Sequence, residues 1–150
     1  MLPLKSDHCY AILDDRGMTG PGLPRQAGIY LHDTRHLSAW RWDFADLALI
    51  HQQGTSASVT QYWSRMRNHA QELMLRRELV LGPRGLAECI EIQNDTNAPA
   101  ILTVGLTVEA DFADIFEARW HPRASPKNPV ERDGLRMRYI VSNQVSEGIK

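Results

Sequence analysis

Short segments in which apolar and polar side chains alternate recur along this sequence and restrict its fold class. In residues 37–44 the apolar row consists of Trp40, Trp42 and Phe44. The clearest segment covers residues 100–110, where every second side chain is apolar: Leu102, Val104, Leu106, Val108 and Ala110. A period of two residues is typical of a strand that buries one face. These segments therefore predict strands.

Nine segments fit this pattern or a shorter version of it: residues 10–13, 28–31, 37–44, 47–52, 58–63, 72–81, 86–93, 100–110 and 135–142. Residues 61–75 also fit a helical period, but we assign their second half to a strand. Turn residues join neighbouring strands, and the proline-rich residues 120–130 predict a loop. Without a convincing amphipathic helix, this pattern predicts an all-β, antiparallel β-sandwich of about ten strands with long irregular loops, in one domain over residues 1–150.

The charge balance and the cysteines limit the partners. The formal net charge is -1, which gives no global field for nucleic acid or an anionic membrane. No apolar run reaches the ~20 residues that cross a bilayer, and the first residues lack the order of a signal peptide. Cys9 and Cys89 have no paired spacing and indicate a reducing compartment. We predict a cytoplasmic protein with neither nucleic acid nor membrane as a partner.

An acidic and aromatic cluster follows the strand predicted for residues 100–110. Its acids are Asp111, Asp114 and Glu117, interleaved with Phe112, Phe116 and Arg119. Two such carboxylates could act as general acid and base on a glycosidic bond at a separation of about 5–10 Å. The interpretation we favour is structural: one acid caps a turn, another pairs with Arg119, and both phenylalanines fill the core.

The segment from His32 to His36 is a second candidate site. Two histidines four residues apart share a face of a strand, but they lie ~13 Å from one another, too far for one zinc ion. We therefore predict no metal site. The alternative is a turn stabilised by the side chains of Asp33 and Thr34, with Arg35 in a salt bridge.

The tryptophans could form either a sugar-stacking platform or part of the core. A Trp-x-Trp-x-Phe row, as at Trp40, is more often buried than displayed. Trp120 lies in the proline-rich segment and is the candidate for stacking on a sugar. The sequence has no nucleophile elbow and no phosphate-binding glycine loop.

Four motifs resemble the N-terminal domain of the bacterial glycogen debranching enzyme family, of the amylo-alpha-1,6-glucosidase type. They are Tyr10-Ala11-Ile12 with Asp15-Arg16-Gly17, the segment from Gly28 to Ser38, Leu75-Arg76-Arg77-Glu78, and the segment from Ala110 to Arg119. The resemblance implies a mutarotase-like supersandwich ahead of an α/α-toroid domain that carries the hydrolytic acids. It also implies that these 150 residues hold no catalytic residue and no cofactor, and are inactive alone. One departure is Trp120, where the family usually has glycine.

The first hypothesis is thus an accessory domain that supports the catalytic domain of the same polypeptide and borders its substrate cleft. The candidate interface or substrate-bordering residues are Asp33, Arg35, Asp111, Asp114, Glu117 and Arg119. The alternative is an independent carbohydrate-binding module that uses Trp120 on an α-glucan. A third hypothesis is a small mutarotase-like enzyme that uses His32 or His36 for proton transfer. If the chain is the front piece of a longer protein, its bare interface would favour a homodimer of the isolated domain.

Overall fold

The computed structural model describes residues 1–120, which form ten strands and a short helix. The elements are β1 (Leu2–Ser6), β2 (Cys9–Leu13), β3 (Gly28–Leu31), β4 (Thr34–Leu37), β5 (Ala39–Phe44), β6 (Ala48–Gly54), β7 (Ser58–Arg67), β8 (Ala70–Gly82), β9 (Gly85–Asn94), β10 (Val104–Glu109) and α1 (Ile115–Trp120).

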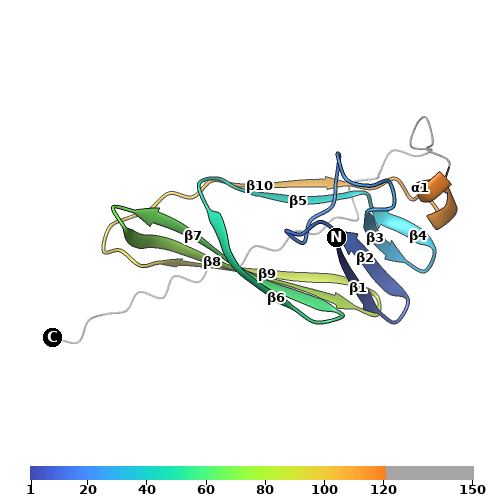
Figure 1. The fold of residues 1–150 in the computed structure, drawn as a ribbon, viewed down its shortest axis with the longest axis horizontal. Helices are drawn as coiled ribbons and strands as arrows, with labels where there is room; N and C mark the ends of the chain where they lie inside the picture. Colours follow the sequence, from blue (N-terminus) through green and yellow to red (C-terminus); the bar gives the residue numbers. More distant parts are fainter. Residues whose placement is uncertain (121–150) are drawn as a thin grey trace.

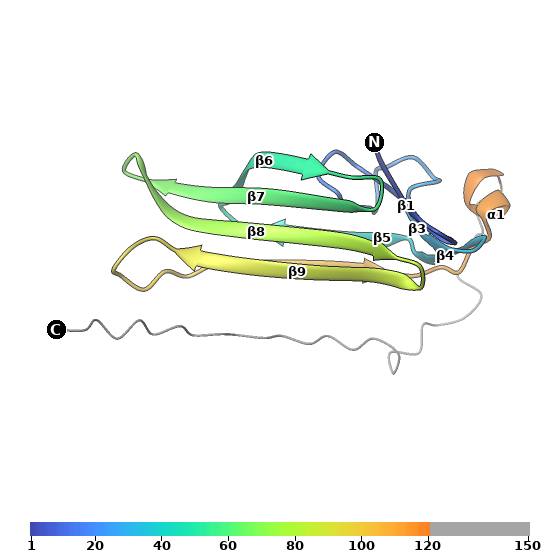
Figure 2. The same cartoon turned by 90° about the horizontal axis from the view of Figure 1, so that it is seen from below.

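The strands form two facing layers, and every strand pair is antiparallel (Figures 1 and 2). One layer is the sheet β6-β7-β8-β9. The other contains the pair β5-β10 and, towards one end, the sheet β1-β2-β3-β4, with α1 beside β4 (Figure 1). This arrangement confirms the predicted all-β sandwich.

Two apolar clusters hold the layers together. In the first, Leu4 and Ile29 of the β1–β4 sheet meet Leu79 and Leu81 of β8. In the second, Phe44 of β5 packs with Trp63 of β7 and Leu75 of β8. The ring of Trp42 is stacked on that of Phe44, which places the predicted aromatic row of β5 against the core. Burial of these large side chains is the main favourable term of a sandwich of this kind.

The helical alternative for residues 61–75 is wrong, and the strand assignment of their second half is confirmed. β7 continues to Arg67 and β8 begins at Ala70. Between them Asn68 and His69 have φ values of 51° and 64°. Two successive left-handed residues are what a tight hairpin turn requires. The apparent helical spacing is thus interrupted by a reversal of the chain.

Three further predictions needed correction. β1 was not anticipated, and α1 includes Trp120, where a loop was expected. The strand expected over 37–44 is divided at Ser38, because β4 pairs with β3 whereas β5 pairs with β10. The strand predicted for residues 135–142 and the loop for 121–130 lie outside the described residues. Among residues 1–120 no helix is long and apolar enough to cross a membrane.

Candidate functional site

Arg35 of β4 holds together the end of the sandwich that carries α1, which we call the α1 end. Its Nε donates to Asp111 Oδ1 over 3.0 Å, and its Nη2 donates to the other oxygen of that carboxylate. Its Nη1 donates to the carbonyls of Arg25 at 2.5 Å and Ala27 at 3.1 Å. Such a bidentate pair fixes both distance and orientation. Arg35 therefore joins the loop before β3, β4 itself and the segment that follows β10.

The ion pair changes the titration of both partners. Burial by itself would raise the pKa of Asp111, but hydrogen bonds and charge from Arg35 outweigh it and hold that pKa below its usual range. Burial likewise opposes the charge of Arg35, yet Asp111 raises its pKa. The carboxyl of Asp111 is thus ionised at neutral pH and committed to Arg35, which is a poor arrangement for a general acid.

Gly28 makes room for the arginine. Its φ is +153°, and a Cβ at this position would lie 2.9 Å from the Leu37 carbonyl oxygen and still closer to the Arg35 side chain. Any other residue here would have to push away the backbone of β4 or the arginine. The Gly28-to-Ser38 segment, singled out by its sequence, is therefore one packing unit with Asp111.

Two of the cluster's acids start the helix. Asp114 Oδ1 accepts the amides of Phe116 at 2.7 Å and Glu117 at 2.8 Å, while Glu117 Oε2 accepts the Asp114 amide at 3.2 Å. This reciprocal pattern is a capping box with aspartate at the N-cap. The Ile115 amide also donates to the Asp33 carbonyl at 2.8 Å, so the start of α1 is attached to the β3–β4 turn.

The aromatic side chains of this segment are exposed, and the prediction that Phe112 and Phe116 fill the core is wrong. The exposed fractions are 46% for Phe112, 69% for Phe116 and 63% for Trp120. The small residues Ala113 and Ala118 face inward instead, where they pack on Tyr30. Phe116 and Trp120 are four residues apart and share one face of α1. We call Phe112, Phe116 and Trp120 the aromatic patch.

Arg119 is also placed differently from the prediction. Its guanidinium lies over the Trp120 ring, with the Cζ 5.4 Å from the ring centroid. Asp111, one of the three acids that could have paired with it, pairs with Arg35 instead. The expected salt bridge of Arg35 is thus confirmed. The positive charge of Arg119 lies beside the aromatic patch.

Stacked tyrosines support the α1 end from below. The rings of Tyr10 and Tyr30 lie 4.6 Å apart and almost parallel, and the Tyr30 hydroxyl donates to the Gln26 carbonyl at 2.9 Å. Burial, with smaller effects of Tyr30 and Asp33, raises the pKa of Tyr10 to about 12. The segment that bears the aromatic patch is therefore packed, through Ala113 and Ala118, on a stacked tyrosine pair.

The histidines do not converge on one site. The rings of His32 and His8 are stacked, with their centroids 4.9 Å apart. The rings of His36 and Phe112 instead meet in a T-shaped arrangement, with their centroids 5.6 Å apart. In the described part of the chain, His8 Nε2 lies 3.6 Å from Asp7 Oδ1. Residues 1–120 contain no group of three or more His, Cys, Asp or Glu side chains placed to hold a metal ion.

A buried polar group surrounds Arg77, and it was not predicted from the sequence. This arginine occupies an inward position of β8 between Leu75 and Leu79, and its side chain is fully buried. It pairs with Glu88, and it donates to Gln61 Oε1 at 2.9 Å and to the Gly17 carbonyl at 2.9 Å. The sequence does contain a signal for this buried group, because the charged Arg77 interrupts the apolar row of a long alternating strand.

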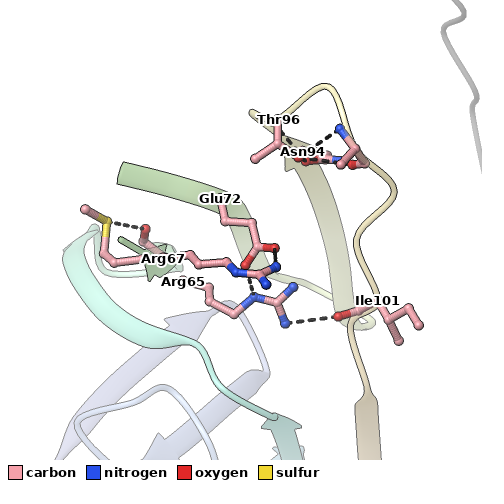
Figure 3. A network of polar contacts seen from close by, with 9 residues as sticks. Arg65, Arg67, Glu72, Asn94, Thr96 and Ile101 are labelled. Atoms are coloured by element: carbon pink, nitrogen blue, oxygen red, sulfur yellow. Dashed lines mark hydrogen bonds and ion pairs between the residues drawn. The ribbon is translucent and has the colours of Figure 1, made fainter. Parts of the chain in front are cut away.

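The opposite end of the sandwich carries an ordinary polar network (Figure 3). Arg65 Nε donates to Glu72 at 2.9 Å and Arg65 Nη1 to the Ile101 carbonyl at 3.0 Å, while Arg67 lies 3.5 Å from Glu72. Nearby, the Asn94 side chain donates to the Ala98 carbonyl at 2.8 Å. These contacts join the β7–β8 hairpin to the β9–β10 connection, which is a structural role.

Comparison with known families gives one match. Residues 4–149 match the family model described as the N-terminal domain of (some) glycogen debranching enzymes. Neither a curated relative nor a solved structure matches the chain. The match covers nearly the whole sequence and confirms the resemblance drawn from the motifs. The chain therefore belongs to the family of N-terminal domains of glycogen debranching enzymes.

Proposed function

We propose that this chain is a non-catalytic accessory domain of an α-glucan debranching glycosidase of the amylo-alpha-1,6-glucosidase type. In this proposal the sandwich is one domain, an α/α-toroid catalytic domain belongs to the same polypeptide, and the α1 end contacts that domain at the border of its substrate cleft. Free thiols at Cys9 and Cys89 support a reducing, cytoplasmic location.

The observation that carries the proposal is the exposure of the aromatic patch on a segment that is held by hydrogen bonds. Phe116 and Trp120 are more than half exposed, although the helix that bears them is capped and tied to the β3–β4 turn. Aromatic side chains with an adjacent arginine are enriched where proteins contact one another, and exposed apolar patches mark such surfaces. The patch therefore suits a protein surface of complementary shape.

The acids of the α1 end support a non-catalytic role. Asp111 is paired with Arg35, and the carboxylates of Asp114 and Glu117 accept backbone amides at the start of α1. Glycoside hydrolysis needs two carboxyl groups that face one another across the bond. The contacts of these three acids hold them to the frame of the domain, so we assign hydrolysis to the catalytic domain.

The test is titration of this chain with an α/α-toroid catalytic domain of a debranching enzyme of this family, supplied as a separate chain. We expect saturable binding that Phe116→Ser and Trp120→Ser each weaken about tenfold, as for interface anchors. The matched control is Ile50→Ser, since Ile50 is 56% exposed in β6, away from α1. Absence of binding, or equal weakening by the control, would contradict the proposal.

A further inference from the structure

Strand β10 has a neighbouring strand on one side only. It pairs with β5, and no other strand of residues 1–120 pairs with it. The carbonyls of Thr103 and Glu109 accept the amides of Ala45 and Ser38, which flank β5. Because successive peptide groups of a strand point to opposite sides, the backbone groups of three residues between them point away from β5: Val104, Leu106 and Val108. Within the described residues, this side of β10 is therefore a free edge.

The core of the sandwich is also incompletely covered on this side. The side chains of Val104, Leu106 and Val108 lie opposite the aromatic row of β5, yet none of them is buried, and Val104 is 39% exposed. β9, the edge strand of the facing layer, lies on the same side (Figure 2). Its Ile92 is opposite the buried Leu75 of β8 but is itself 52% exposed. Both edges thus leave inward-facing apolar surface open to solvent.

The outer face of the free edge carries an acid without an ion pair. Glu109 alternates with Gly105 and Thr107 on this face and is exposed. No ion pair among residues 1–120 involves Glu109. On β9, by contrast, Glu91 is already paired with Arg76. A strand added to β10 is therefore favoured by apolar side chains on its inner face and a positive charge on its outer face.

We propose that residues 135–142 of this chain occupy the free edge of β10, as a third strand of the β5–β10 sheet. This segment has the alternation that the edge requires. One row carries Arg136 and Arg138, and the other row is apolar: Leu135, Met137, Tyr139 and Val141. The apolar row extends the inner face of β10, and the arginines lie on the outer face with Glu109.

The direction of the chain favours β10 over β9 as the partner. β10 runs towards the α1 end, whereas β9 runs away from it (Figure 2). A segment that returns from α1 is thus antiparallel to β10 and parallel to β9. All strand pairs among residues 1–120 are antiparallel, and consecutive strands of a chain are most often neighbours.

One register satisfies both faces together. Arg136 opposite Glu109 forms a cross-strand ion pair and places Arg138 opposite Thr107. On the inner face the same register puts apolar residues opposite one another: Met137 and Val108, Tyr139 and Leu106, Val141 and Val104.

The test is disulfide trapping in the chain of residues 1–150 that carries Thr107→Cys and Arg138→Cys, with diamide as the oxidant. Opposed residues of an antiparallel pair have Cα atoms about 4.5–5.5 Å apart, a separation that a disulfide spans. We expect an intramolecular disulfide between positions 107 and 138, identified by mass spectrometry of proteolytic peptides. The matched control is Thr107→Cys with Met137→Cys. It should not form the disulfide, because position 137 faces the other side of the sheet.

Hydrogen exchange gives a second readout without introduced cysteines. The amides of Leu106 and Val108 point to the free edge, so bound residues 135–142 should protect them in the unchanged chain. Met137→Asp should accelerate their exchange about tenfold or more, because it places a charge on the inner face. The matched control, Ile140→Asp, adds the same charge on the outer face and should leave the exchange nearly unchanged. The amides of β8 should keep their protection in both variants.

Three results of the trapping experiment would overturn the inference. They are no disulfide between positions 107 and 138, a disulfide between position 138 and Cys89 of β9, or a disulfide between two copies of the chain. The second would place the segment on β9, and the third would make a second copy the occupant. Fast exchange of Leu106 and Val108 in the unchanged chain would also overturn it. The outcome is independent of the α1 end, since Phe116→Ser should leave the trapped disulfide unchanged.

Discussion

Two arginine–carboxylate pairs, one in the interior and one at the α1 end, show opposite balances between burial and charge. Around Arg77 the side chains are 0% and 7% exposed, and around Arg35 they are 12% and 29% exposed. Burial lowers the pKa of Arg77 despite the attraction of Glu88. Burial also opposes the charge of Arg35, but there the hydrogen bonding and charge of Asp111, together with Tyr30, outweigh burial and the pKa rises.

The difference separates two uses of the same chemistry. In the interior the pair is almost fully buried, so Arg77 and Glu88 are best explained by the groups they position, which are the Arg16 and Gly17 carbonyls and the Trp42 indole. At the α1 end, partial exposure reduces the desolvation cost, and the pair stabilises the attachment of α1. Substitutions at the two pairs should therefore differ in how much they lower the free energy of unfolding and in how far through the domain the effect extends.

The largest effect should come from Glu88→Leu. This change leaves the Arg77 charge buried without its carboxylate and should lower the free energy of unfolding by about 3–5 kcal/mol. Urea denaturation measures it. The double change Arg77→Met with Glu88→Leu should recover most of the loss, because both charges are removed. If Glu88→Leu alone changed the free energy of unfolding by less than about 1 kcal/mol, the view that desolvation dominates at this pair would be contradicted.

Asp111→Asn should have a smaller and more local effect. The charge-assisted bonds to Arg35 are weakened, at a cost of about 1–3 kcal/mol, while the guanidinium keeps access to water. Hydrogen exchange should show faster exchange of the α1 amides, such as that of Ala118, with β8 nearly unchanged. Equal loss of protection in β8 would show that the α1 end is not a separate unit.

Low pH should remove the stability that the Asp111–Arg35 pair contributes. The pKa of Asp111 is lower in the folded chain than in the unfolded one, so its stabilisation is complete above the unfolded value of about 3.9. It is lost as the pH falls through the lower folded value. The stability difference between the unchanged chain and Asp111→Asn should thus narrow in acid. A difference that grows on acidification would contradict the assigned direction.

Asp114→Ala removes the N-cap of α1 and should cost about 1 kcal/mol. The two amides of Phe116 and Glu117 lose their acceptor. Asp114→Asn is the control, since asparagine caps nearly as well and should restore most of the stability in thermal denaturation. If the Asn variant is no better than the Ala variant, the contribution comes from charge and not from capping.

The smallest effect is expected at the opposite end of the sandwich. Arg67 is 74% exposed and lies 3.5 Å from Glu72, which Arg65 also holds. Arg67→Gln should change the free energy of unfolding by less than about 0.5 kcal/mol, as for exposed ion pairs. A loss as large as that of Asp111→Asn would remove the energetic distinction between the α1 end and the opposite end.

Much of the fold could be predicted from alternation, because the period of two is a local property of each strand. The strands over 28–31, 58–63 and 72–81 and the sandwich itself follow from it. β1 was not predicted because it is five residues long and contains Pro3 and Lys5. The break at Ser38 was not predicted because the alternation of apolar and polar residues continues on both sides of the point where the chain changes sheets.

The family and the set of candidate residues at the α1 end were determined by the sequence alone, since they depend on residue types at short spacings. Only the tertiary structure decided their partners. Arg35 and Asp111 are 76 positions apart, and their pairing depends on how β4 and the end of β10 are brought together. Likewise, Ala113 and Ala118 pack on Tyr30 in the interior, whereas Phe112 and Phe116 are exposed. Pairing and exposure are set by distances between segments, and local spacing does not contain those distances.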